Sequence, residues 1–95
     1  MLNEYSSDFY SSEIEINISK FYKSRIKVTV ISIPGSTILM KNGSTIITAK
    51  ESNGRWVFYP DKFGVWIIEA LKGTDYAKST IQINSVKEYE KQISY

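Results

Sequence analysis

Carboxylate and hydroxyl side chains are the groups in this sequence that could perform chemistry, because the chain contains no His and no Cys. A serine or cysteine nucleophile activated by histidine is therefore excluded. The usual ligands of zinc are missing as well. A Ser-Lys pair stays open in principle, but no motif places one. We expect that the protein is not an enzyme.

Two pairs of acidic residues alternate along the chain, Glu13 with Glu15 and Glu88 with Glu90. Side chains two residues apart lie on the same face of a β-strand. Two carboxylates on one face could serve a glycosidase. A solvated strand face produces the same spacing, and we favour that interpretation.

Oxygen-bearing side chains also cluster at residues 51–53, Glu-Ser-Asn. Calcium binds clustered oxygen ligands of this kind, but Asn and Ser are equally typical of turns. The five glycines are isolated and fall at expected turns, so they do not form a phosphate-binding loop. The sequence therefore predicts neither a metal nor a cofactor.

The charge pattern bears on the class of partner. The net charge is +2, and the Lys and Arg residues are scattered among Asp and Glu. Nucleic acid and membrane surfaces are bound by denser basic patches, so we expect neither as a partner. The N-terminus lacks the pattern of a signal peptide, and no apolar run reaches the roughly 18–20 residues that span a bilayer. We expect synthesis in the cytoplasm without a signal peptide.

The elements that must position these residues are β-strands. Apolar residues alternate with polar ones in most segments between turn signals, as is typical of half-buried strands. Asn42-Gly43 predicts a type I′ hairpin. The sequence predicts an all-β fold, an antiparallel two-sheet sandwich of about seven strands. The expected strands are 14–18, 25–33, 36–41, 44–50, 55–59, 65–71, 75–84 and 86–95.

We expect residues 13–95 to form a single domain. Residues 1–12 are polar and rich in Ser, and they predict a flexible N-terminal arm.

An internal echo links the two ends of the chain. Residues 13–26 and 80–93 share six identities at an offset of 67 residues. Chance similarity between two β-rich segments is one explanation. The alternative is a repeat-like unit, residues 27–93, of a tandem array. The echo also favours a strand over a helix at 86–95.

Short motifs between Ile26 and Tyr95 carry a family resemblance. They resemble a small β-sandwich module of phage and prophage tail, baseplate and neck proteins. Such modules are similar to carboxypeptidase-regulatory, or transthyretin-like, and PEGA-type Ig-like domains. The matching residues are Pro34-Gly35-Ser36, Gly54, Trp56, Phe58, Gly64, Trp66, Ala70, Gly73, Tyr89, Ser94 and Tyr95.

The resemblance implies an Ig-like or transthyretin-like sandwich that is structural or adhesive rather than catalytic. It also implies a location in a virion or phage-derived particle. This chain has Val65 and Ile67 where those modules usually carry outward threonines.

The aromatic segment 53–70 divides into two faces. If residues 55–60 and 64–71 pair as a hairpin, both tryptophans share one apolar face, which predicts the core. The opposite face is too apolar for a solvated sheet and predicts a contact surface. A neighbouring module, a second copy or the strand 14–18 could cover it. The predicted contact residues are Val57, Tyr59, Val65, Ile67 and Leu71.

The sequence favours a structural or interaction module of a phage particle, with a protein partner or self-association. One alternative is a carbohydrate-binding or host-surface adhesion module, in which Tyr59, Tyr76 or Tyr89 would stack on a surface polysaccharide. A small phage-encoded inhibitor of a host protein is a further alternative.

Overall fold

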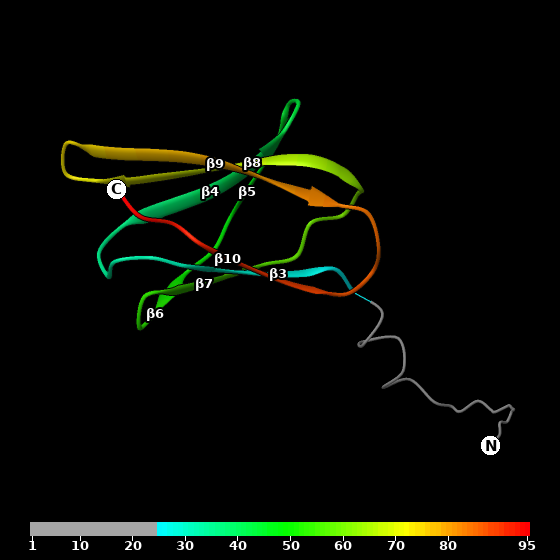
Figure 1. Cartoon of the computed structure of the whole chain (residues 1–95), viewed down its shortest axis with the longest axis horizontal. Helices are drawn as coiled ribbons and strands as arrows, with labels where there is room; N and C mark the ends of the chain where they lie inside the picture. Colours follow the sequence, from blue (N-terminus) through cyan, green and yellow to red (C-terminus); the bar gives the residue numbers. More distant parts are fainter. Residues whose placement is uncertain (1–24) are drawn as a thin grey trace, which may run out of the picture.

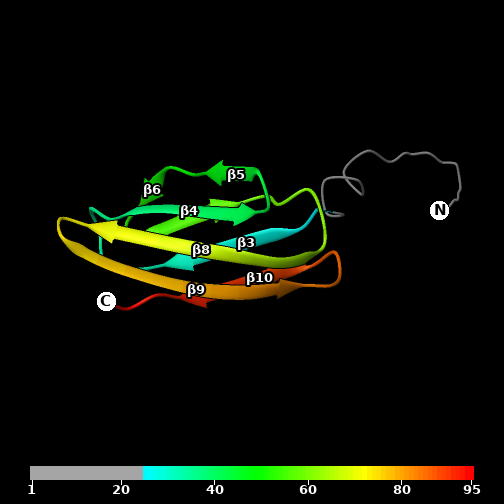
Figure 2. The ribbon, with the colours of Figure 1, turned by 90° about the horizontal axis from the view of Figure 1, so that it is seen from above.

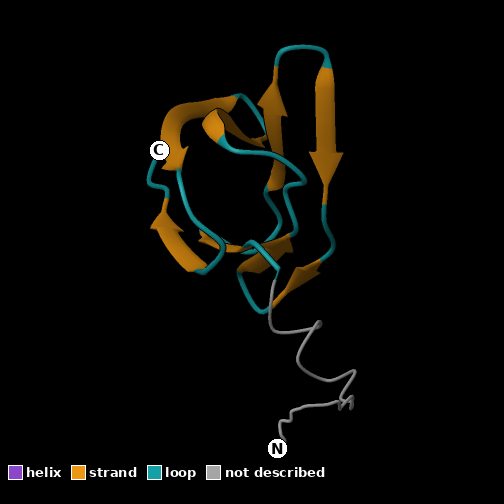
Figure 3. Cartoon of the chain, turned by 90° about the vertical axis from the view of Figure 1, so that its right-hand side faces the viewer, coloured by secondary structure: helices purple, strands orange, loops and turns teal. Residues whose placement is uncertain are grey.

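The computed structural model describes residues 25–95, and this part of the chain contains β-strands and no helix (Figures 1 and 3). The predicted arm 1–12, the predicted strand 14–18 and residues 13–24 of the echo lie outside the described residues. The strand predicted within 86–95 is confirmed. The strands are β3 (Lys27–Ile31), β4 (Thr37–Asn42), β5 (Thr45–Thr48), β6 (Glu51–Ser52), β7 (Arg55–Phe58), β8 (Gly64–Lys72), β9 (Asp75–Ile83) and β10 (Glu88–Gln92).

The strands form two sheets of four, stacked as the two layers seen in Figure 1. One sheet has the order β10-β3-β7-β6 and the other β5-β4-β8-β9. All pairs are antiparallel except β10 with β3, which is parallel. The predicted two-sheet sandwich is confirmed.

The predicted pairing of residues 55–60 with residues 64–71 is wrong. β7 pairs with β3 and β6, whereas β8 pairs with β4 and β9. The segment 59–63 carries the chain from one sheet to the other, and it contains Pro60, which has no N–H to donate to a ladder. Alternation gives the same pattern whether two apolar faces are neighbours in one sheet or face each other across a core.

The core consists of the inward side chains of both sheets. Trp56 and Phe58 come from β7, and Trp66 and Ile68 come from β8. Trp66 also donates its indole N–H to the Lys62 carbonyl at 3.0 Å, so its polar atom is satisfied. The predicted burial of both tryptophans is confirmed. The buried apolar set is Ile26, Val28, Val30, Ile38, Met40, Trp56, Phe58, Trp66, Ile68, Ala70, Ile83 and Ile93.

The turn between β4 and β5 differs from the expected one. Asn42 pairs with Thr45, so the turn residues are Gly43 and Ser44. Of these two, only Gly43 has a positive φ, 61°, as the first central residue of a type II′ turn does. A type I′ turn would need a positive φ at both residues. The observed register pairs Met40 with Ile47. A turn at 42–43 would instead have placed Met40 opposite the polar Thr45.

A type I′ turn does occur between β6 and β7. Asn53 and Gly54 have φ values of 53° and 76°. Gly54 is buried, and a Cβ added there would lie 2.7 Å from the Ser32 carbonyl oxygen. Gly54 N–H and Gly35 N–H both donate to the Glu51 carboxylate, at 3.3 and 2.8 Å. Glu51 therefore ties this hairpin to the β3–β4 connection.

A tyrosine fixes the crossing from β9 to β10. The Tyr89 hydroxyl accepts from the backbone N–H groups of Asn84 and Ser85, both at 3.1 Å, and donates to the Ser85 carbonyl at 3.1 Å. The side-chain hydrogen bond with Ser85 is the largest cause of the lowered pKa of Tyr89. The arrangement is similar in kind to the tyrosine corner of other β-sandwiches.

We expect Gly54→Ala to lower the free energy of unfolding by about 3 kcal/mol, because it combines a positive φ with a clash against backbone. Gly43→Ala is the matched control, since its Cβ meets no atom within 4 Å. It should cost about 1 kcal/mol from φ alone. Urea unfolding measures both. Equal losses would contradict the packing of Gly54 against Ser32.

Tyr89→Phe should lower the free energy of unfolding by about 1–2 kcal/mol, because two backbone N–H groups lose their acceptor. Thermal and urea unfolding followed by circular dichroism would measure the loss. Tyr59→Phe is the control, since it keeps the ring that Arg25 covers. A loss no larger than that of the control would show that the hydroxyl does not hold the crossing.

Candidate interaction surface

The five predicted contact residues do not form one surface. Val57 and Tyr59 lie on the outer side of the sheet β10-β3-β7-β6. Val65, Ile67 and Leu71 lie on the outer side of the other sheet. Because the inner faces of the two sheets meet in the core, the outer faces point in opposite directions (Figure 1). Their division follows from the placement of β7 and β8 in different sheets.

The outer face of β5-β4-β8-β9 gathers more apolar side chains than the three predicted ones, Val65, Ile67 and Leu71. Its strongly exposed members are Ile46 (58%), Tyr76 (55%), Val65 (52%) and Leu71 (49%). The cross-strand register places Tyr76 opposite Leu71, and Lys41 between Ile46 and Ile67. We call this set the apolar outer face: Leu39, Ile46, Val65, Ile67, Leu71 and Tyr76.

Three of these residues, Leu39, Ile46 and Tyr76, were missed as contact residues. The signal for Leu39 was present, since it alternates with the inward Ile38 and Met40. Tyr76 could be placed only from the β8–β9 register, which is set by the turn at Gly73-Thr74.

An ion pair lies in the middle of the apolar outer face. Lys41 Nζ is 3.2 Å from Glu69 Oε2, and the Tyr76 hydroxyl donates to the same oxygen at 3.0 Å. The hydrogen bond from Lys41, followed by that from Tyr76, lowers the pKa of Glu69. Lys78 lies opposite Glu69 on the same face and also contributes to its lowered pKa, so the apolar side chains surround two lysines and one glutamate.

The opposite outer face is more highly charged. Arg55 shares β7 with Val57, Lys27 lies on the neighbouring strand β3, and Glu88 and Glu90 lie one strand further, on β10. The Arg25 guanidinium lies 3.8 Å from the centre of the Tyr59 ring. A charged, two-signed surface of this kind is typical of a solvated sheet face.

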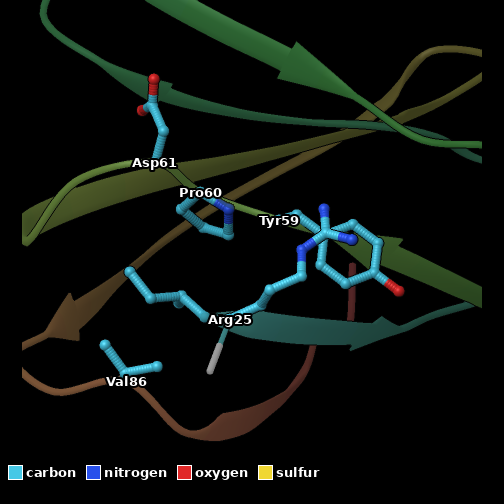
Figure 4. A pocket seen from close by; sticks show the side chains of 6 residues that line it. Arg25, Tyr59, Pro60, Asp61 and Val86 are labelled. Carbon is cyan, nitrogen blue, oxygen red and sulfur yellow. The ribbon is translucent and has the colours of Figure 1, made fainter. Parts of the chain in front are cut away.

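A shallow groove lies at the end of the sandwich where the described chain begins (Figure 4). Arg25 covers Tyr59 in it, and the Asp61 carboxylate points away from Arg25. The groove therefore brings together no acid–base pair and no nucleophile with a base. The residues that line it are Arg25, Ile26, Tyr59, Pro60, Asp61 and Val86.

Within residues 25–95, no group of three or more His, Cys, Asp or Glu side chains could hold a metal ion. The Glu51 carboxylate accepts backbone N–H groups, in keeping with turn chemistry at 51–53. In the same part of the chain, no helix is long and apolar enough to cross a membrane.

The contribution of Glu69 to stability should depend on pH. Its pKa in the folded chain lies below its ordinary value of 4.5. The ionised carboxylate therefore stabilises the fold above that value, and this contribution is lost as the pH falls through the lower, folded pKa. We expect Glu69→Gln to lower the urea midpoint at about pH 7, with the difference from wild type shrinking toward about pH 3. A difference that stays constant with pH would contradict the ion pair.

Comparisons with known proteins assign no family to this chain. No family model matches it, and no curated protein gives a significant sequence match. Functional interpretation therefore depends on the two outer faces and on the edges of the sheets.

Proposed function

We propose that this chain is a non-catalytic structural and interaction module that binds a protein partner through the apolar outer face. The observation that supports the proposal is the exposure of Ile46, Val65, Leu71 and Tyr76 on one sheet surface. Exposed apolar groups gathered on one face of a soluble domain are characteristic of contact sites. The compensated Lys41–Glu69 pair lowers the number of unpaired charges that a partner would have to desolvate.

The particle setting of the proposal comes from the sequence motifs. The Gly-x-Trp-x-Phe and Gly-x-Trp-x-x-x-Ala motifs resemble those of phage and prophage tail modules. Trp56, Phe58, Trp66 and Ala70 are buried, which is consistent with a structural role for these motifs. We therefore propose a component of a tail, baseplate or decoration of such a particle.

No observation favours the carbohydrate-binding alternative over this proposal. Sugar platforms use coplanar exposed aromatic rings, and both tryptophans here are buried. Tyr59 and Tyr76 are exposed on opposite outer faces, and the Tyr89 hydroxyl is used within the β9–β10 crossing. An inhibitor of a host protein would use the same apolar outer face, so only the identity of the partner separates it from a particle component.

The proposal is tested by incorporation into particles. Phage particles produced in the organism that encodes this chain are purified, and the amount of chain in them is measured by quantitative mass spectrometry. The variant Ile46→Glu with Leu71→Glu places two charges on the apolar outer face. We expect its incorporation to fall by about tenfold or more, as for loss of a buried apolar contact.

The control is Val57→Glu, which adds a charge to the opposite outer face. It should be incorporated within about twofold of wild type. Absence of the wild-type chain from particles would contradict the particle setting. Equal incorporation of both variants would contradict the role of the apolar outer face.

A further inference from the structure

Among the four sheet edges formed by residues 25–95, the edge of β9 differs from the other three. β5 has four residues and β6 has two, and the five residues of β10 include Glu88, Glu90 and Lys91. Short or charged edge strands are the usual protection against pairing with another chain. β9 has nine residues, contains neither Pro nor Gly, and pairs with β8 throughout without a bulge. Lys78 is its only charge between Tyr76 and Ile83.

The β8–β9 register shows which backbone groups face this edge. Lys72 and Asp75 flank the two-residue turn and form the first hydrogen-bonded pair. From there, non-hydrogen-bonded and hydrogen-bonded pairs alternate along the two strands. Every second residue of β9 consequently turns its N–H and C=O groups away from β8. These residues are Tyr76, Lys78, Thr80 and Gln82. Figure 2 shows β9 along one margin of the molecule, with β8 on its inner side.

We propose that the β9 edge pairs with the β9 edge of a second copy of this chain, antiparallel and about a twofold axis at Ser79. Such an interface is isologous, because each copy contributes the same strand. It joins two four-stranded sheets into one continuous sheet. The proposal goes beyond the partner binding proposed above, since it concerns the edge of the sheet and not the apolar outer face.

The sequence of β9 is complementary to itself in this register. Outward-facing backbone groups meet when Tyr76 lies opposite Gln82 of the second copy and Lys78 lies opposite Thr80 of the second copy. The register uses the whole strand and places no like charges directly opposite each other. A register centred on residue 78 would set two lysines against each other, which is unfavourable.

The side chains toward the core fit the same register. Ala77 and Ile81 are only partly buried, at the rim of the core beside the open edge. In the proposed pairing, Ala77 of each copy lies opposite Ile81 of the other. The second copy therefore covers apolar surface that the single chain leaves at its rim.

Charge substitutions at the edge test the proposal on the full chain by sedimentation velocity over a range of concentrations. We expect the wild type to be a dimer. Thr80→Lys should be a folded monomer, because residue 80 is exposed and the new lysine would face Lys78 of the second copy. Thr80→Glu is the matched control and should remain a dimer, because the new glutamate would face Lys78 of the second copy and leave the pairing of Lys78 with Glu69 in its own chain unchanged. Ile46→Glu with Leu71→Glu should sediment as the wild type does.

Disulfide cross-linking supplies an independent measurement, because the chain has no cysteine of its own. Residue 79 of the two copies would form a non-hydrogen-bonded pair with Cα atoms about 4.5 Å apart, within disulfide range. We expect Ser79→Cys to form a covalent dimer under mild oxidation. Gln82→Cys should not form one, because residue 82 is more exposed than residue 79 but lies far from residue 82 of the second copy.

Three results would overturn the proposal. One is a wild-type chain that is monomeric at every concentration, as would be seen if another segment of the same chain occupied the edge. Another is a dimer that Thr80→Lys leaves unchanged. The third is cross-linking of Gln82→Cys as efficient as that of Ser79→Cys.

Discussion

The contact between the inner faces of the two sheets is the interaction on which the rest of the structure depends. Trp56 and Phe58 on β7 and Trp66 and Ile68 on β8 are buried between the sheets. The chain has no cysteine, so no disulfide supplements this contact. Each large aromatic buries roughly 150–250 Å². Because the core takes the inner faces of both sheets, recognition within residues 25–95 is left to the two outer faces and the edges.

The alternation of apolar and polar residues was sufficient to predict much of the fold. It identified the strands of residues 27–92 except β6, whose residues 51–52 were expected in a turn, and it identified the burial of both tryptophans, because side-chain parity is a local property of the backbone. The assignment of β7 and β8 to sheets is not local. It depends on where the chain crosses the core, and the alternation of side chains along a strand does not determine that crossing. The same limit explains why Val57 and Val65 were expected on one surface although they lie on two.

Register is the second property that the sequence left open. The shift of the β4–β5 turn to Gly43-Ser44 sets which residues oppose each other, and hence that Lys41 lies between Ile46 and Ile67. The candidate surface could be predicted only in part for this reason. Its members on β8 follow from alternation, whereas the positions of Ile46 and Tyr76 relative to them follow from turns whose geometry several residue pairs could satisfy.

The parallel pairing of β10 with β3 has a mechanical consequence. The described chain enters at Arg25, beside the start of β3, and leaves after β10, which runs in the same direction, so these two points lie at opposite ends of the sandwich (Figure 1). Tension applied between them acts along both strands and loads their hydrogen bonds from Lys27 to Ile31 together, in shear. An antiparallel pair pulled from one end would open one bond at a time. Tension in this direction therefore meets several hydrogen bonds at once before the two strands separate.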